Sequence, residues 1–406
     1  MTDTKPARIA VVVSHPIQHF CPQYSNWSKL PGVDLRVFFA SDHGKVAYQD
    51  PGFGRKVQWT GLSLEFPHEF LPGASGKSLQ LDLDSPELPD RLSAFAPDAV
   101  ILYGYSQALQ RRARRWADST KTPTVMISDS ELRTHRSFFK RVLRALILPR
   151  IYQGVRLFLT VGDANEDHYR RFGVSDDRLV RCFFPIDTAS YDRVAERRAE
   201  HRARVRMALG LREDHHMVLM AGKLLRSKRQ ADLVRFANAI RDERDDITVV
   251  LAGTGPAELD LRALARRAGP GGVVFAGFLT PDELAAYYAA ADVYVHCSER
   301  DAHSLAISEA IYSGLPVVVS DRCGSFGPTD DVQVGLNGFV YRCGDVDDLS
   351  DKVMQVIDDS GRLSAMGNAS RRLGQAHQAL AHGAALLQAL AVLAAHVQTR
   401  RSDSTL

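Results

Sequence analysis

The chain has 406 residues, a length that accommodates two domains of ordinary size, each with its own core. Hydrophobic residues make up 45% and charged residues 24%, and 51 basic side chains against 48 acidic ones give a net charge of +3. This balance excludes a disordered chain and a dedicated nucleic-acid binder, which would be far more basic. The basic excess is concentrated in residues 111–150, with 11 Lys and Arg against 3 Asp and Glu, a local charge of +8.

The five cysteines are scattered and form no C-x-x-C pair, which argues against a zinc site or a disulfide framework and favours a reducing compartment. The first apolar run is too short for a signal peptide, and no uninterrupted stretch of about 18 apolar residues occurs. We therefore expect a cytoplasmic protein without a membrane span.

The first half of the chain alternates short apolar runs with helical patterns. Each run is apolar at successive positions, as in strands that are buried on both faces of a parallel sheet. The predicted strands are Ile9–Val13, Leu35–Ala40, Ala99–Tyr103, Thr124–Ser128 and Leu157–Val161, with helices at Ser106–Ala117 and Phe138–Ile147. The alternation predicts right-handed βαβ units and a doubly wound domain over residues 1–190.

A second alternation predicts another such domain over residues 215–375. Its strands are Met217–Ala221, Thr248–Ala252, Val273–Ala276, Val293–His296 and Val317–Ser320, and its helices are Arg229–Arg241, Leu259–Arg267, Pro281–Ala290 and Leu305–Ser313. The highly charged residues 191–214 are expected to link the domains. Residues 376–406 are rich in Ala and Leu and are expected to form a helix that packs back toward the N-terminal domain. The fold class is therefore α/β, with two Rossmann-like domains facing a cleft.

The most informative motif is Ser298–Asp321, between two predicted strands. It places Asp301 in the loop before a helix and Glu309 about one turn inside that helix. The amides of residues 302–305 and the helix dipole together favour binding of a pyrophosphate. Carboxylates at these two positions suit the hydroxyl groups of a sugar and a ribose.

This segment resembles glycosyltransferase family 4, whose members carry a Glu-x7-Glu pattern and then Gly-x-Pro-Val. Here the pattern reads Asp301-Ala-His-Ser-Leu305, Glu309-Ala and Gly314-Leu-Pro-Val317, so Asp replaces the first Glu and Ser304 replaces a Gly. The resemblance implies the GT-B fold and a retaining transferase. It assigns Asp301 to donor-sugar hydroxyls, Glu309 to the ribose, and Ala302, His303, Ser304 and Leu305 to the donor diphosphate.

Two further segments match the donor site of that family. Gly222, Lys223 and Lys228 fall where its members hold the diphosphate with Arg and Lys, although such residues alone would be interpreted as surface charge at a helix start. Gly277, Phe278 and Leu279 fall where relatives hold the nucleobase through backbone atoms, with core packing of the aromatic ring as the alternative.

The N-terminal half contributes a Ser-His-Pro-Ile-Gln-His segment directly after the first strand, where strand ends line a ligand crevice. A subset of bacterial relatives, of the surface-polysaccharide type, shares His-Pro-Ile-Gln and also Asp-Pro-Gly-Phe-Gly, here residues 50–54. We expect His15 and Gln18 to contact the sugar or acceptor, with a cap or turn role for His15 as the alternative. Asp129, after the fourth strand, is expected to contact the acceptor or sugar.

No metal site is predicted. The Asp-Leu-Asp triplet at residues 82–84 lies in a polar loop without strand context and is expected to be solvated, and no other group of residues has metal-ligand spacing.

The basic segment 136–150 combines two faces. Phe138, Phe139, Val142, Leu143, Leu146 and Ile147 recur at helical spacing, and Arg136, Lys140, Arg141 and Arg144 occupy the other face. Such a helix either packs on its domain in the ordinary way or lies on an anionic membrane surface. Ordinary packing is the first expectation, and the arginine cluster at 111–115 and the lipid-linked acceptors of several relatives add support for the membrane alternative.

We therefore expect a retaining, metal-independent glycosyltransferase. The donor is a nucleotide-diphosphate sugar of UDP, GDP or ADP type, and the acceptor is a glycan, lipid-linked or small molecule. Positive groups would stabilise the departing diphosphate in place of a metal. The candidate catalytic residues are Asp301, Glu309, Lys223, Lys228, Asp129 and His15. A non-catalytic GT-B partner subunit, motivated by the departures from the family pattern, and a nucleotide-sugar epimerase remain as alternatives.

Overall fold

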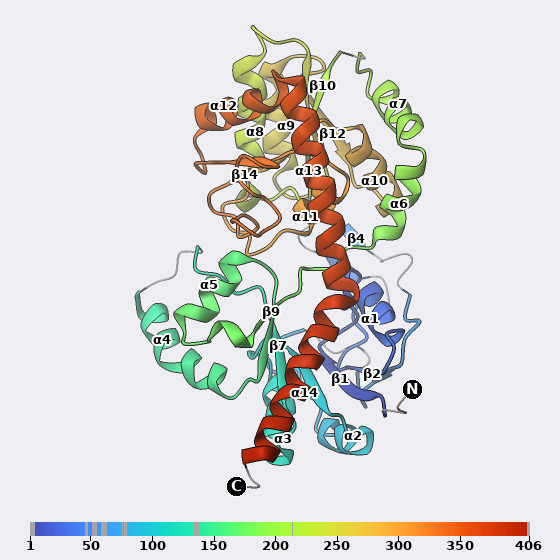
Figure 1. Ribbon diagram of the computed structural model, residues 1–406. Coiled ribbons are helices and arrows are strands. Elements are labelled where there is room, and N and C mark those ends of the chain that lie inside the picture. The colour runs from blue at the N-terminus through green and yellow to red at the C-terminus, as the bar shows by residue number, and fades with distance from the viewer. Residues whose placement is uncertain are drawn as a thin grey trace.

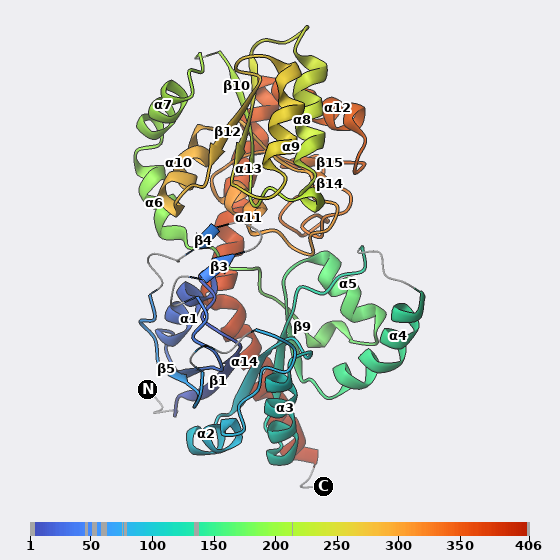
Figure 2. The same cartoon turned by 180° about the vertical axis from the view of Figure 1, so that it is seen from behind.

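A computed structural model of the chain describes residues 5–44, 48–50, 55–57, 63–74, 76, 79–133, 138–212 and 214–403. Side chains are described throughout these ranges except at 48–50, 55–57 and 396–403. The chain forms two α/β domains placed end to end, with one long helical run along a face of both (Figures 1 and 2). This arrangement confirms the predicted fold class. Residues 51–54 of the Asp-Pro-Gly-Phe-Gly segment, and Arg136, lie outside the described residues.

The N-terminal domain is built on a seven-stranded parallel sheet of order β5-β2-β1-β6-β7-β8-β9. Its central strands are apolar along their whole length because helices cover both faces. The strands are β1 Ala7–Val13, β2 Val33–Phe39, β5 His68–Phe70, β6 Ala99–Tyr103, β7 Thr124–Ile127, β8 Leu157–Thr160 and β9 Leu179–Arg181. The helices are α1 Phe20–Ser28, α2 Leu88–Phe95, α3 Ala108–Thr120, α4 Phe138–Gln153 and α5 Asp163–Arg171. A separate antiparallel pair consists of β3 Tyr48–Asp50 and β4 Arg55–Val57.

The C-terminal domain has a six-stranded parallel sheet of order β12-β11-β10-β13-β14-β15. Its strands are β10 His216–Ala221, β11 Ile247–Ala252, β12 Val273–Gly277, β13 Val293–His296, β14 Val317–Ser320 and β15 Gly338–Tyr341. Its helices include α8 Gln230–Ile240, α9 Glu258–Ala265, α10 Pro281–Ala290, α11 Leu305–Tyr312 and α12 Val346–Ile357. The start of α10 shows why such helices form where they do, since Thr280 and Glu283 make a reciprocal capping box around Pro281 at the first turn.

The segment 191–214, expected to be a linker, is largely helical and belongs to the C-terminal domain. It contains most of α6 Thr188–Glu196 and all of α7 Arg198–Ala208. Tyr191, Val194 and Val205 are buried in the C-terminal core, and two arginines of α7 pair with Asp292. The linker prediction is wrong because it rests on composition, which the charged residues dominate. The few apolar residues are spaced so that they face one side of a helix.

The backbone crosses between the domains twice, and the two crossings bind each other. The first is the extended segment after β9, and the second is the helical run formed by α13 Ser360–Ala379, a π turn at Leu380–Ala384 and α14 Ala385–Asp403. The Ile186 N–H donates to Oε1 of Gln378 at 2.9 Å, and Nε2 of Gln378 donates to the Phe184 carbonyl at 3.2 Å. Phe183 stacks on His377 with ring centroids 3.6 Å apart.

The π turn lies where the long run meets α1. Carbonyl groups in a π turn lose their regular helical partner, and the Ala381 carbonyl accepts instead from Nε2 of Gln23 at 2.8 Å and Nε1 of Trp27 at 3.0 Å. These buried bonds fix the run on the N-terminal domain.

Within the described residues, the helical run Ser360–Ala395 is long and apolar enough to cross a membrane by length and composition alone. In the structure its residues Ala385, Leu386, Ala389 and Leu393 pack into the N-terminal core. Core helices of globular proteins pass the same test of length and composition, so this result alone identifies no membrane span.

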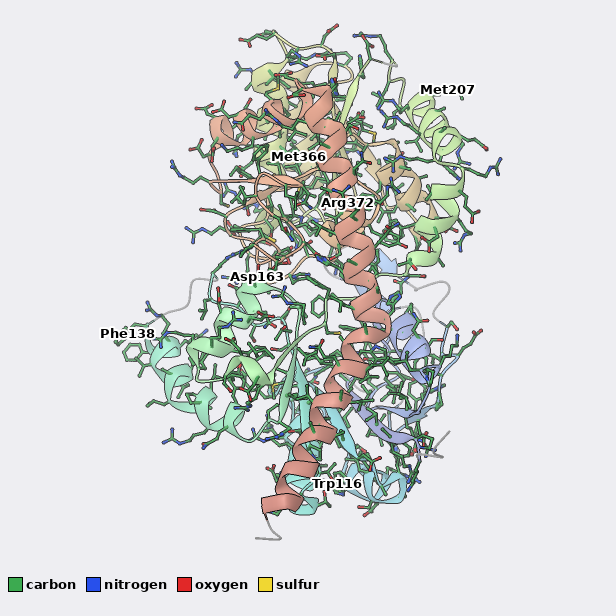
Figure 3. The ribbon with its side chains drawn as sticks, in the orientation of Figure 1. Trp116, Phe138, Asp163, Met207, Met366 and Arg372 are labelled. Carbon is green, nitrogen blue, oxygen red and sulfur yellow. The ribbon has the colours of Figure 1, made fainter. Side chains whose placement is uncertain are left out.

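A third contact joins the domains away from the crossings. The Thr329 N–H donates to the carboxylate of Asp163 at 2.8 Å, and the Asp163 N–H donates to Asp330 at 2.7 Å. Arg133 places its guanidinium 3.6 Å from the ring centre of Phe326. Figure 3 labels Asp163 at the boundary between the two domains.

The packing of the long run on the C-terminal domain gives a first prediction. A Cβ atom at Gly374 would lie 2.6 Å from the Cα of Tyr312, whereas one at Gly361 in the same helix meets only an Asp359 side chain at 3.2 Å. Gly374→Ala should therefore lower the free energy of unfolding by about 1–3 kcal/mol through overpacking, and Gly361→Ala should leave it unchanged or raise it. Thermal unfolding of both variants checks this, and equal melting temperatures would show that the contact at Tyr312 is not tight.

Candidate active site between the domains

A cavity of about 440 Å³ lies between the domains, at the carboxyl ends of strands from both sheets. The N-terminal wall is residues 15–19 of the loop after β1, together with His43 and Gly44. The C-terminal wall comes from the ends of β10, β11 and β12 and from α11, and its lining residues include Gly222, Gly253, Phe278, Leu279, Thr280, Leu305 and Glu309.

Two of these strand ends approach each other closely, which explains the glycines there. Gly253 has a φ of +142°, and a Cβ atom at that position would lie 2.0 Å from the carbonyl oxygen of Gly222. No side chain fits between the strands at this point. The backbone of both glycines is thereby left open to a bound molecule.

Glu309 lies one turn inside α11, with its carboxylate on the cavity and two tyrosines behind it. The Tyr288 hydroxyl donates to Oε2 at 3.0 Å, and Tyr191 of α6 also hydrogen-bonds the carboxylate. Burial raises the pKa of Glu309 to about 7 despite these bonds. Neither tyrosine was predicted, and Tyr191 lies in the segment expected to be a linker. A buried carboxylate needs donors, which is the signal that could have pointed to them.

Asp301 is held by a cation and a histidine. Nζ of Lys228 donates to Oδ2 at 2.5 Å, and Nε2 of His296 lies 2.8 Å from the same oxygen. Burial alone would raise the pKa of Asp301, but these two partners bring it down to about 2. Asp301 is therefore ionised at neutral pH. His296, the last residue of β13, was not predicted, although a polar residue that ends an otherwise apolar strand points to the sheet edge.

The helix-start amides differ from the expectation of four free donors. The Ser304 N–H donates to Oγ of Ser325 at 2.8 Å. Leu305 lines the cavity, but Ala302, His303 and Ser304 do not. The loop after β14 thus occupies the Ser304 amide, and contact of residues 302–305 with a donor stays a prediction.

His303 instead belongs to a buried charged cluster. Its Nε2 lies 3.3 Å from Asp331, whose other oxygen is 2.8 Å from Nδ1 of His377. Ser308 also donates to Asp331, at 2.7 Å. Burial opposes charge on His303, but the adjacent Asp331 carboxylate raises its pKa.

The residues of this cluster could also be metal ligands. His303, Asp330 and Asp331 offer ligand atoms within 4.8 Å of one another, the one such group among the described residues. The oxygens of Asp331 already accept from Ser308 and His377, so the donor set suits a hydrogen-bonded ion network better than a metal. The sequence could not reveal the cluster because its members are far apart in the chain.

Three further predicted residues, Asp129, Lys223 and Gly277, lie at the carboxyl ends of strands but are not among the residues that line the cavity. Asp129 follows β7 and faces the other domain, since Asp301 and His303 are among the charges that act on it, and burial raises its pKa. Lys223 follows β10 and is partly exposed, and its carbonyl accepts from Gln230 at 2.9 Å. Gly277 ends β12 beside the lining residues Phe278 and Leu279.

The N-terminal wall contains several histidines. His15 and Gln18 line the cavity as the motif predicts, together with His19 and His43, which were not singled out. Oγ of Ser14 lies 2.8 Å from Nδ1 of His15, and the rings of His15 and His43 meet edge to face at 5.5 Å. Burial, with the neighbouring histidine, lowers the pKa of both His15 and His19 to about 4. These rings therefore offer hydrogen bonds and no positive charge at neutral pH.

Comparison with known proteins identifies a family and several relatives to which the chain is similar. The family described as Glycosyl transferases group 1 matches residues 201–373. A GDP-mannose-dependent alpha-(1-6)-phosphatidylinositol monomannoside mannosyltransferase of Mycobacterium tuberculosis is 33% identical over 194 residues, 46% of this chain and 48% of that protein. The alpha-monoglucosyldiacylglycerol synthase of Streptococcus pneumoniae is 33% identical over 135 residues, 33% of this chain and 30% of that protein. The chain thus matches less than half the length of either relative.

Solved structures agree over nearly the whole chain. HepE of Anabaena, in complex with UDP and glucose, has a TM-score of 0.63 at 16% identity and covers 98% of this chain and 100% of its own. WaaG, a glycosyltransferase involved in lipopolysaccharide biosynthesis, has a TM-score of 0.56 at 15% identity and covers 93% of this chain and 98% of its own. At such identities the likeness confirms the fold, the two-domain GT-B arrangement. The match to the group 1 glycosyltransferase family extends over residues 201–373, less than half of the chain.

The raised pKa of Glu309 gives a second prediction. Between its ordinary value of 4.5 and about 7, the folded protein holds a proton that the unfolded chain has released. The contribution of Glu309 to stability therefore falls as the pH rises through this window, by roughly 1–3 kcal/mol. The melting temperature of the wild type, relative to Glu309→Gln, should decrease between about pH 5 and pH 8.

A matched variant isolates the effect. Glu196→Gln removes an exposed carboxylate of α6 and should give a difference from wild type that does not change over the same pH range. If the Glu309→Gln difference is equally flat, Glu309 is not buried as described.

Proposed function

We propose that the chain is a retaining glycosyltransferase that moves a sugar from a nucleotide-diphosphate donor to a glycan, lipid-linked or small-molecule acceptor. The donor binds the C-terminal domain, and the acceptor binds mainly the N-terminal domain. One observation carries the proposal. Glu309 lines a cavity that both domains form, and Asp301, held by Lys228, lies in the loop that leads into the same helix.

Each donor group has a residue of matching chemistry. The ribose hydroxyls would donate to Glu309, the donor-sugar hydroxyls to Asp301, and the nucleobase would bind between Gly277 and Leu279. Lys228 and Lys223 would stabilise the negative charge on the departing diphosphate, the role that a bound cation has in other enzymes. The base is of UDP, GDP or ADP type.

On the opposite wall, Asp129, His15 and Gln18 would contact the acceptor or the transferred sugar. The neutral state of His15 suits hydrogen bonding to hydroxyl groups, because a neutral imidazole both donates and accepts. The surface-polysaccharide type expected from the His-Pro-Ile-Gln motif belongs to this proposal. The names of the two bacterial relatives, which specify lipid products, support a lipid-linked acceptor.

A non-catalytic partner subunit is the second candidate, favoured by one observation. The Ser304 amide is engaged by Ser325, so one expected phosphate donor is occupied. Release of free nucleoside diphosphate in the presence of a sugar donor and an acceptor extract, lost in Glu309→Ala, supports the transferase. Donor binding without release supports the partner subunit, and a product of unchanged mass without release supports an epimerase.

The third prediction concerns the diphosphate. Lys228→Met should raise the Kd for the recognised nucleoside diphosphate about tenfold or more, since a charge-assisted bond to phosphate is lost. Arg226→Met is the matched control, because Arg226 lies two residues earlier on the same turn, its side chain is 90% exposed, and it pairs with Asp260. Its Kd should change by less than about twofold.

Isothermal titration of the wild type with UDP, GDP and ADP identifies the ligand for this comparison. Failure of all three to bind would contradict the donor site. Equal effects of the two substitutions would show that Lys228 does not contact the phosphates.

A further inference from the structure

Helix α4 presents its apolar face to solvent. Phe138 and Phe139 are 71% and 83% exposed, and Val142, Leu143, Leu146 and Ile147 are each at least 43% exposed. At about 100° per residue, these six side chains cover roughly half of the helix circumference without interruption. Figures 1 and 2 both show α4 at the outer edge of the N-terminal domain, and Figure 3 shows Phe138 pointing away from the body.

The opposite face attaches the helix to its domain. Leu148 and Tyr152 are buried in the core beside β7 and β8, and Arg144 reaches back to the Tyr105 hydroxyl at 3.4 Å. The ordinary alternative for residues 136–150, a helix whose apolar face packs on the domain, is therefore wrong. A patch of this size on one element marks an interaction surface.

Cations lie on α4 together with the patch, and further cations line a groove that reaches the C-terminal end of α4 at Ile151. α4 contains no acidic residue, and Lys140, Arg141 and Arg150 are exposed on it. A groove of about 420 Å³ between α3 and α4 is lined by Arg111, Arg114 and Arg115 and by one acid, Asp118, which pairs with Arg114 at 3.8 Å. The groove therefore keeps an excess of positive charge.

We propose that the exposed face of α4 and the arginine groove form a docking surface for an anionic lipid bilayer. The apolar side chains enter the interfacial region, and the arginines contact lipid phosphates. This proposal stands on the surface alone and does not require that the cleft transfer sugar.

Charge distinguishes this occupant from a second copy of the chain. A twofold dimer would place the same patch against itself. Lys140 and Arg141 would then face their own counterparts, and α4 offers no carboxylate to neutralise them. An anionic bilayer satisfies both the apolar and the cationic parts of the surface.

The test is flotation of the full chain with vesicles of phosphatidylcholine alone and with vesicles of phosphatidylcholine and phosphatidylglycerol in a three-to-one ratio. The wild type should bind the anionic vesicles at least about tenfold more tightly, and added salt should reduce this preference. The double substitution Phe138→Ser and Phe139→Ser should abolish binding to both. Leu259→Ser, which alters an 81% exposed leucine of the C-terminal domain, should bind like the wild type.

The groove is tested separately by Arg111→Gln with Arg115→Gln, which should lose most of the preference for phosphatidylglycerol. Arg266→Gln with Arg267→Gln, at exposed positions of the C-terminal domain, is the matched control and should keep it. All variants should retain the wild-type melting temperature and nucleotide affinity, which separates this proposal from the donor site.

Three results would overturn the proposal. The first is equal flotation of the wild type and the double phenylalanine variant. The second is a groove variant that keeps the full preference for anionic vesicles. The third is a dimer in sedimentation that depends on Phe138 and Phe139, without vesicle binding.

Discussion

The structure depends on the contact between the two places where the backbone passes from one domain to the other. The extended segment 182–187 and the helical run through residue 378 share buried hydrogen bonds and the stack of Phe183 on His377. This contact sets the carboxyl ends of two separate parallel sheets opposite each other. Loops that follow strands far apart in the sequence therefore line one cavity, and a ligand held by one domain is presented to the other.

Asp301, in the loop before α11, and Glu309, on that helix, are set to different protonation states by their surroundings. Lys228 and His296 keep Asp301 ionised, whereas burial against Tyr288 and Tyr191 keeps Glu309 near its titration point at neutral pH. On the opposite wall, burial lowers the pKa of His15 and His19 to about 4, so these two rings are uncharged at neutral pH. Lys228, which pairs with Asp301, supplies positive charge at the turn after β10, where a leaving diphosphate would need it.

The sequence predicts the central strands because continuous apolar runs leave few other interpretations, as for β1 and β10. It misses β5 and β9, which have three residues and carry polar side chains. It predicts Glu309 through its spacing from Asp301, but not Tyr288, Tyr191 or His296, because their contacts form only in the folded chain. The sequence also does not predict that the apolar face of α4 is exposed. Periodicity predicts that a helix has an apolar face, but not whether other residues cover that face.

Hydrogen–deuterium exchange with the donor nucleotide tests the central claim most directly, namely that both domains form one nucleotide-sugar site. We predict that a bound nucleotide sugar slows exchange in the segments around residues 222–229, 277–284 and 301–309 and also in the loop 14–19 of the other domain. Protection confined to the C-terminal domain, or located away from the cleft, would contradict this account.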